Sequence, residues 1–198
     1  MSVLQEFSLD NNKLIIVQDD CVSNPRVDFD NLGTFLDTQG NGDNTNFSFG
    51  RNYDSREDFI ETGEEEVRKH FKDVAVILAV HKYQHSDVGY STDYSYPYNC
   101  RWDSGTVGFI FATKKDIREN FGIKRVTKKY IEQTEKILKA EIETFSQWAN
   151  GEVLGFRLEN EDEEIIDSCY GFYGTDVETN GVLDHLREEW REVVKEAA

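Results

Sequence analysis

Short apolar runs along the chain predict the strands of a folded domain. They span residues 13–17, 74–80, 107–112, 153–158 and 165–172. The run at 74–80 is too short for most buried helices and is rich in β-branched residues, which favour strands. The sequence therefore predicts five strands, the last two separated by an acidic turn at 159–164.

Apolar residues at helical spacing predict one long helix and a C-terminal helix. The long helix covers about 127–149, with Thr127 as its capping residue and Asn150 and Gly151 at its end. The C-terminal helix has an apolar stripe formed by Leu183, Leu186, Trp190, Val193 and Val194.

Two shorter helical segments precede the long helix. We expect Ser55 to cap a helix over about 56–72 that is broken at Gly63, and Thr113 to cap a short helix that stops at Gly122. Between residues 23 and 55 the chain is polar and rich in turn residues, which predicts a long exposed loop.

This order of elements predicts an α+β fold with a mostly antiparallel sheet. We expect a single domain over 1–198, because the chain contains no internal repeat, low-complexity linker or Pro-rich boundary. Hydrophobic residues make up 38% of the chain and aromatic residues 13%, which is enough to build a core. The acidic residues are therefore expected on a folded surface rather than in a disordered tail.

The chain is strongly acidic, with 39 acidic and 22 basic residues and a net charge of −17. Residues 1–60 contain 11 acidic and 4 basic residues and residues 151–198 contain 14 and 4, whereas the middle is near neutral. A negative field repels nucleic acid and anionic membranes and favours basic surfaces of other proteins. We therefore expect a protein partner, with no direct binding of nucleic acid or membrane.

The chain begins without a basic, apolar leader and contains no apolar stretch of the ~20 residues that span a bilayer, which predicts a cytoplasmic protein. Three widely separated cysteines, Cys21, Cys100 and Cys169, predict reduced thiols rather than disulfides. The glycine-rich phosphate-binding motifs are absent, and we expect no cofactor.

Two patterns resemble metal sites without completing one. His81 and His85 form an HxxxH pair, but side chains four residues apart on a strand lie about 13 Å apart, too far for one ion. Residues 37–43 begin like a calcium loop, but Ser48 occupies the position that needs a bidentate Glu, which favours a surface turn. We therefore expect no bound metal.

A cluster of carboxylates is an alternative that would suit Mg²⁺ and phosphoryl chemistry. It would require convergence of Asp28, Asp30, Asp103, Ser104 and Asp167. On this alternative the protein is a metal-dependent hydrolase of a nucleotide or phosphodiester, with its catalytic set formed by Asp30, His81, His85 and Asp103. Aspartates near turns more often form caps and Asx turns, which favours a protein without enzymatic activity.

Two surfaces are expected to bind a partner. One is acidic and comprises Glu159, Glu161, Asp162, Glu163, Glu164 and Asp167. Clustered carboxylates can imitate a phosphate array, although a solvated turn is the alternative. The other is aromatic and comprises Tyr94, Tyr96, Tyr98 and Trp102. Such side chains give rigid contact area for a protein partner, although packing of a long loop is the alternative.

Several separated blocks along the chain form a recognisable set. The blocks are NPR (24–26), DNLG (30–33), WDSG (102–105) with VGFI (107–110), EIETFSQWANGEV (141–153) and DSCYGFYG (167–174). Together they resemble a family of proteins encoded by bacteriophages and other mobile elements of bacteria. The chain departs from the family pattern at residues 27–29, where a Glu-Trp pair is usual, and at Thr106, where Gln is usual. The resemblance implies an origin in a phage or mobile element but no particular activity.

Charge and resemblance together favour an acidic phage protein that acts in the cytoplasm of a bacterial host. We expect it to bind and inhibit a host nucleic-acid-handling defence protein, of the restriction or CRISPR-effector type, by occupying a basic groove as a mimic of DNA. The metal-dependent hydrolase is one alternative. A structural accessory protein that forms a homo-oligomer through the tyrosine-rich loop is another.

Overall fold

The computed structural model describes residues 2–43, 45–50 and 53–197 and divides the chain into two compact units. The terminal unit comprises Met1–Ser23 and Gln147–Ala198, and the central unit comprises Asn24–Ser146. The sequence predicts one domain over 1–198 because neither boundary coincides with a linker or a change in composition. The fold class is α+β with antiparallel sheets.

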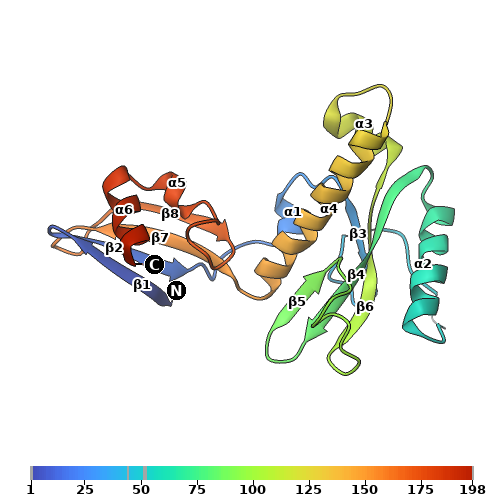
Figure 1. Cartoon of the computed structure of the whole chain (residues 1–198), viewed down its shortest axis with the longest axis horizontal. Helices are drawn as coiled ribbons and strands as arrows, with labels where there is room; N and C mark the ends of the chain where they lie inside the picture. The colour runs from blue at the N-terminus through green and yellow to red at the C-terminus, as the bar shows by residue number, and fades with distance from the viewer. Residues whose placement is uncertain (1, 44, 51–52, 198) are drawn as a thin grey trace. The chain divides into compact units, whose positions relative to one another are not determined.

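The terminal unit is a four-stranded antiparallel sheet with helices on one face (Figure 1). Its strands, in the order β1-β2-β7-β8, are β1 (Val3–Leu9), β2 (Asn12–Gln18), β7 (Val153–Glu159) and β8 (Ile165–Tyr173). The helices are α5 (Val182–His185) and α6 (Glu188–Ala197). Leu14, Phe156 and Trp190 belong to the core between sheet and helices.

The central unit is inserted between two neighbouring strands of the terminal unit. β2 and β7 pair from Lys13 opposite Glu159 to Gln18 opposite Leu154, although the entire central unit separates them in sequence. Beside this insertion point the indole Nε1 of Trp148 donates a hydrogen bond of 3.1 Å to the carbonyl of Val22. This bond joins the outgoing and returning segments of the chain.

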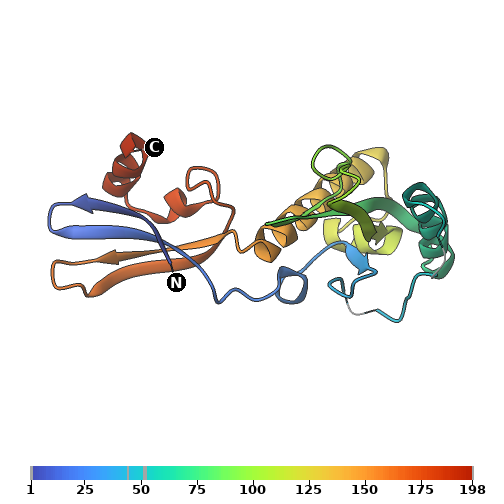
Figure 2. The same cartoon turned by 90° about the horizontal axis from the view of Figure 1, so that it is seen from below.

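The central unit is a second four-stranded antiparallel sheet, with helices on both faces (Figures 1 and 2). Its strands, in the order β3-β6-β4-β5, are β3 (Thr34–Asp37), β6 (Ser104–Thr113), β4 (Val74–Gln84) and β5 (Val88–Ser91). The helices are α1 (Pro25–Asp28), α2 (Arg56–His70), α3 (Lys114–Phe121) and α4 (Lys128–Ala149), whose last residues belong to the terminal unit.

Side-chain alternation along the strands of the central unit supplies two hydrophobic layers. Phe35 packs against Phe145 of α4, with ring centroids 5.4 Å apart. Its neighbour Leu36 belongs instead to the cluster on the α2 side, together with Phe59 and Phe109. Residues next to each other on a strand therefore pack against different helices, as the two-residue period of a strand requires.

The expected caps at Ser55, Thr113 and Gly122 are confirmed. The Ser55 Oγ accepts a hydrogen bond of 3.1 Å from the Asp58 backbone N–H at the start of α2. Thr113 and Asp116 form a reciprocal capping box at the start of α3, and Gly122 ends that helix in the left-handed region with φ of 63°. The long helix is confirmed as α4. The expected C-terminal helix is confirmed only in part, because Leu183 belongs to the short α5 and Leu186 lies in extended backbone before α6 begins at Glu188.

The expected break at Gly63 is wrong, because α2 is continuous through this position. A Cβ at residue 63 would lie 2.8 Å from Cε2 of Phe109, so glycine lets the helix approach the sheet closely. The glycine is required by packing rather than by a change in backbone direction.

The expected loop over residues 23–55 is wrong in part, because it contains α1 and β3. Phe35 of β3 and Leu32, which lies between the two elements, are buried. β1 and β5 are also strands that the sequence pattern did not predict. These short elements depend on pairing with distant strands, which local composition does not report. Among the described residues, no helix combines the length and apolar character needed to cross a membrane.

Candidate partner-binding surfaces

The acidic turn between β7 and β8 has a well-defined backbone built around Asn160. The Asn160 Oδ1 accepts hydrogen bonds from the backbone N–H groups of Asp162 (3.0 Å) and Glu164 (2.9 Å). The Asn160 N–H donates to the Glu164 carbonyl at 3.0 Å, and Glu163 has a positive φ of 62°. The sequence analysis missed Asn160, although asparagine at the start of a polar turn is a signal of an Asx turn.

A second turn of the same sheet contributes to this acidic end. The Asn11 Nδ2, between β1 and β2, donates a hydrogen bond of 3.0 Å to Glu161 Oε2. Asp10 lies in the same turn, and Figure 1 shows both hairpin turns at one end of the sheet. The structure therefore adds Asp10 to the neighbourhood of the predicted acidic residues.

Glu159 differs from the other predicted acidic residues. Its side chain is only 12% exposed, and its Oε1 lies 2.8 Å from Nε of Arg157. A carboxylate paired in this way offers little free charge to a partner. Glu161, Asp162, Glu163, Glu164 and Asp167 are exposed, as the sequence analysis expected.

Helix α6 presents further exposed carboxylates. Glu188, Glu192 and Glu196 are spaced four residues apart, about 6 Å along the helix axis, and Glu189 is exposed beside them. The buried side of α6 is formed by Trp190 and Val194. We use the name acidic surface for the exposed carboxylates of the β7–β8 turn, β8 and α6, which are Glu161, Asp162, Glu163, Glu164, Asp167, Glu188, Glu189, Glu192 and Glu196.

The net charge is concentrated in the terminal unit. This unit contains 18 acidic and 5 basic residues, a net charge of −13, whereas the central unit contains 21 and 17, a net charge of −4. The fold thus brings the acidic N-terminal and C-terminal segments of the sequence into one unit. The sequence analysis counted residues 24–60 with the acidic N-terminal segment, but the structure places them in the central unit. The charge difference between the two units was therefore not evident from the sequence.

The tyrosine-rich loop of the central unit exposes three of the four predicted aromatic residues. Tyr96 is 80% and Trp102 87% exposed, and Tyr94 is also exposed. Arg56 donates to the Tyr94 hydroxyl at 2.8 Å and its guanidinium lies 5.3 Å from the centre of that ring. Tyr98 is different, because it lies against Gly89 and its carbonyl accepts a hydrogen bond of 2.7 Å from Ser104 Oγ.

His81 is buried and uncharged. Its Nδ1 lies 3.0 Å from Thr106 Oγ1, and its ring packs against Tyr94 with centroids 5.0 Å apart. Burial, with a smaller contribution from the charge of Arg56, lowers the pKa of His81 to about 4. The neutral imidazole is therefore part of the packing of β4 against β6.

The residues of the hydrolase alternative occupy different surroundings. His85 Nδ1 lies 3.5 Å from Asp103 Oδ1 on the surface, and both line a hollow of about 550 Å³. Asp30 lines another hollow, of about 480 Å³, together with Asp43 and Arg26. Within the part of the chain that the structure describes, no group of three or more His, Cys, Asp or Glu side chains is arranged to hold a metal ion.

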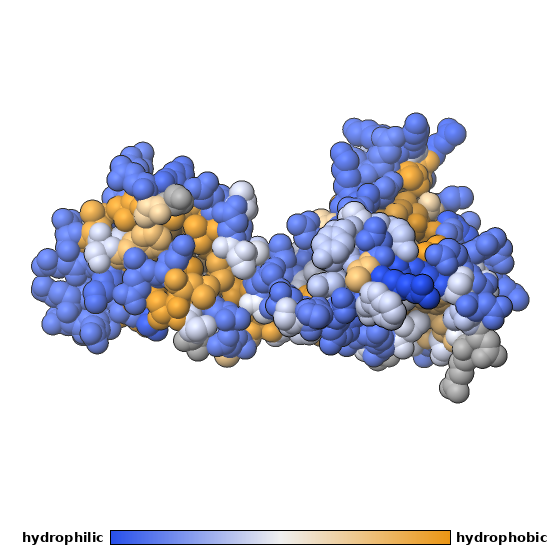
Figure 3. Space-filling model, turned by 60° about the horizontal axis from the view of Figure 1, so that its bottom comes forward, coloured by the Kyte–Doolittle hydropathy of each residue, from blue (hydrophilic) through white to orange (hydrophobic). Residues whose placement is uncertain are grey.

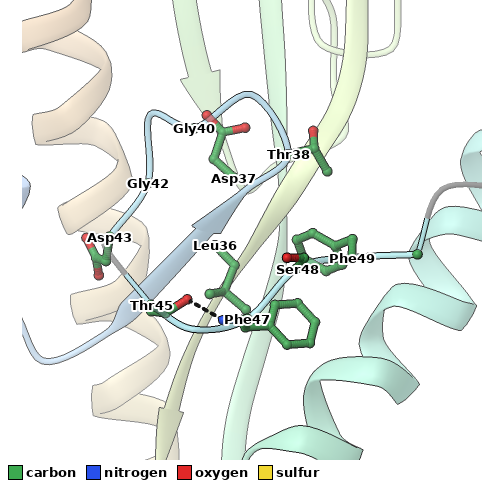
Figure 4. Close-up of a pocket in the computed structure, with 11 residues that line it drawn as sticks. Leu36, Asp37, Thr38, Gly40, Gly42, Asp43, Thr45, Phe47, Ser48 and Phe49 are labelled. Atoms are coloured by element: carbon green, nitrogen blue, oxygen red, sulfur yellow. Dashed lines mark hydrogen bonds between the residues drawn. The ribbon is translucent and has the colours of Figure 1, made fainter.

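The loop that begins like a calcium site satisfies its carboxylates internally. Asp37 accepts hydrogen bonds from the backbone N–H of Gln39 (2.8 Å) and from Asn41 Nδ2 (2.9 Å). Asp43 binds Arg26 instead, and Figure 4 shows the two carboxylates apart along the loop, beside a hollow of about 560 Å³. This arrangement agrees with the predicted surface turn.

Residues from three of the blocks that carry the phage resemblance meet around Arg26. Its guanidinium donates to Asp43 at 2.7 and 2.9 Å, to Asn31 Oδ1 at 3.0 Å, to Glu141 Oε2 at 2.8 Å and to the carbonyl of Gly33 at 2.6 Å. Burial lowers the pKa of Arg26, but the hydrogen bonds and charges of Asp43 and Glu141 outweigh burial and raise the pKa overall. Because each of these groups is bonded to Arg26, the cluster holds the fold together rather than offering free groups to a ligand.

Neither a family model, nor a curated protein, nor a solved structure matches this chain.

Proposed function

We propose that this protein binds and inhibits a nucleic-acid-handling protein, of the restriction or CRISPR-effector type, by placing the acidic surface in that protein's basic groove. The resemblance to bacteriophage proteins makes the cytoplasm of a bacterial host the proposed setting. The single observation that carries the proposal is the charge of the terminal unit, which holds −13 of the net −17.

The acidic surface is supported by rigid elements. The hydrogen bonds of Asn160 hold the backbone of the β7–β8 turn, and α6 is anchored by Trp190 and Val194 in the core. Carboxylates carried by ordered backbone lose less conformational entropy on binding than those of a flexible tail. This favours a surface that competes with a phosphate array over one that only keeps the protein soluble.

Binding of this kind has a recognisable electrostatic signature. Lys and Arg side chains in a nucleic-acid groove are spaced to bind phosphates, and surface carboxylates would replace those phosphates. Such contacts accelerate association and are screened by salt, with a Debye length of about 10 Å at 0.1 M and about 3 Å at 1 M. We therefore expect affinity to fall steeply as ionic strength rises.

The test is displacement of a labelled DNA duplex from purified restriction endonucleases and CRISPR effectors, followed by fluorescence anisotropy. We expect the protein to displace the duplex from at least one of them at low salt. The combined variant Glu161→Gln, Asp162→Asn, Glu163→Gln and Glu164→Gln should weaken displacement about tenfold or more, because four charges of the array are removed.

The matched control removes four exposed carboxylates from the central unit, in the variant Glu57→Gln, Glu61→Gln, Glu65→Gln and Glu143→Gln. It changes the net charge equally, so displacement should stay within about twofold of the unmodified protein if the position of the charge matters. The proposal would be overturned if both variants lost displacement equally, if displacement did not depend on salt concentration, or if no enzyme of the panel released its duplex.

A further inference from the structure

Strand β8 is an edge of the sheet in the terminal unit. It is the last strand in the order β1-β2-β7-β8, and Figure 2 shows it along the outer side of that sheet. Among the described residues, strand pairing on its other side is absent. Such an edge leaves backbone N–H and C=O groups available to another extended chain.

Two common protections of an edge strand, lysine and proline, are absent from β8. Ile165 and Ile166 are 56% and 53% exposed, and Tyr170 is exposed further along the strand. Hydrophobic side chains at the surface of the terminal unit are visible in Figure 3.

A short segment of β8 has the regular geometry that strand addition requires. From Asp167 to Tyr170 its residues pair in unbroken register with Leu158 to Gly155 of β7. Register shifts occur on both sides of this segment. The regular part is therefore long enough for a few added main-chain hydrogen bonds, with Ile166 and Tyr170 close to its ends.

Charge identifies the class of occupant. β8 itself carries Asp167 and follows directly on the carboxylates of Glu163 and Glu164. A second copy added edge to edge would bring two strands of this kind together, so like charges would approach each other. A basic extended segment would place its cations beside these carboxylates and its apolar residues beside the exposed isoleucines.

We propose that β8 binds an extended segment of a partner protein, of alternating basic and apolar residues, as an added strand. This assignment rests on the proposed function, because the basic character of the partner is taken from it. Main-chain hydrogen bonds would supply affinity, and the carboxylates beside β8 would select a basic sequence.

The probe is a ten-residue peptide of alternating lysine and valine, added to the full-length protein. NMR should show shifts and slowed hydrogen exchange of amides in β8 on addition of the peptide. The double variant Ile165→Thr and Ile166→Thr should weaken binding about tenfold, because apolar contact is lost while threonine keeps the strand preference. The matched control, Val3→Thr with Leu4→Thr, alters similarly exposed residues of β1, the opposite edge, and should change binding less than about twofold.

A second peptide keeps the test decisive if the double variant does not fold. It has the same sequence with alternate backbone nitrogens methylated, so its charge is kept while one hydrogen-bonding edge is removed, and it should bind at least about tenfold more weakly. Equal binding of both peptides, or protection at β1 instead of β8, overturns strand addition. If the β8 amides become protected from hydrogen exchange as the protein concentration rises, with no peptide present, the edge binds a second copy of the protein. That result also overturns the proposal.

The two proposals fail separately. Displacement of duplex by the protein, without any response of β8 to the alternating peptide, overturns the β8 assignment alone. Strand addition of the peptide without duplex displacement supports the β8 assignment and overturns the proposed inhibition of nucleic-acid-handling proteins.

Discussion

At the scale of single residues, Arg26 joins segments of the central unit that are far apart in sequence. Its five hydrogen bonds link α1 to Asn31, Gly33 and Asp43 and to Glu141 of α4. Glu141 also accepts a hydrogen bond of 2.7 Å from the Leu32 backbone N–H. The turn-rich sequence around residue 26 therefore folds through a buried ionic cluster in addition to the local N-cap of α1 at Asn24.

We expect Arg26→Met to lower the free energy of unfolding by about 3–5 kcal/mol, because two carboxylates lose their partner in a partly buried site. Urea unfolding followed by circular dichroism measures the change. Arg68→Met is the control, since Arg68 and Glu64 form an exposed pair 2.8 Å apart on α2 and its loss should cost less than about 1 kcal/mol. Equal destabilisation by both variants would contradict a special role for Arg26.

His81 should make stability depend on pH. Its pKa is about 4 in the folded protein and about 6.5 when unfolded, so the unfolded state binds the proton more tightly. Stability due to this residue is complete above about pH 6.5 and is lost as pH falls toward 4, by up to about 3 kcal/mol. In urea unfolding at pH 7 and pH 5, His81→Gln should show a smaller acid loss than the unmodified protein.

The comparison needs an exposed histidine as its control. His85→Gln should retain the acid loss of the unmodified protein, because His85 is largely exposed beside Asp103. An NMR titration that places the pKa of His81 near 6.5 would refute the argument.

At the scale of elements, local signals and tertiary packing contribute differently. The caps at Ser55 and Thr113 and the apolar stripe of α4 are local, and the sequence predicted them. β1 has mostly exposed residues, and its strand character comes from pairing with β2. The sequence likewise located the exposed acidic turn but missed the pairing of Glu159 with Arg157, because an ion pair across neighbouring positions of one strand depends on side-chain orientation.

The role of Gly63 in α2 can be tested by whether its substitution with alanine stabilises or destabilises the protein. Glycine to alanine in a helix interior usually stabilises by about 1 kcal/mol, but here the new methyl group would lie 2.8 Å from Phe109. Phe109 is buried and packed between Phe49 and Phe59, with centroids 5.7 and 5.6 Å away. We therefore expect Gly63→Ala to destabilise by about 1–3 kcal/mol in thermal or urea unfolding.

A double-mutant cycle with Phe109→Leu supplies the control. The smaller side chain should relieve the close contact, so Gly63→Ala should cost less in the presence of Phe109→Leu than alone. A stabilising effect of Gly63→Ala in the unmodified background would show that α2 does not need glycine at this position.

At the scale of the whole molecule, the fold sorts charge between two units. The terminal unit carries a net −13 and the central unit −4, although both contain about 20 acidic residues, because most of the basic residues belong to the central unit. In the central unit acidic and basic residues nearly balance, so its long-range field is weak. The terminal unit has few basic residues and keeps a long-range negative field. The acidic surface and the exposed aromatic loop thus offer partners two different chemistries on one chain.

The insertion of the central unit between β2 and β7 also sets an order of events during protein synthesis. The β1–β2 hairpin leaves the ribosome early, but β7 follows only after the whole central unit, a delay of roughly ten seconds at usual elongation rates. During that interval the apolar side chains of Leu14 and Ile16 lack the neighbouring strand β7 and the covering helices α5 and α6. The nascent chain therefore carries an N-terminal hairpin without the rest of its sheet through most of its translation.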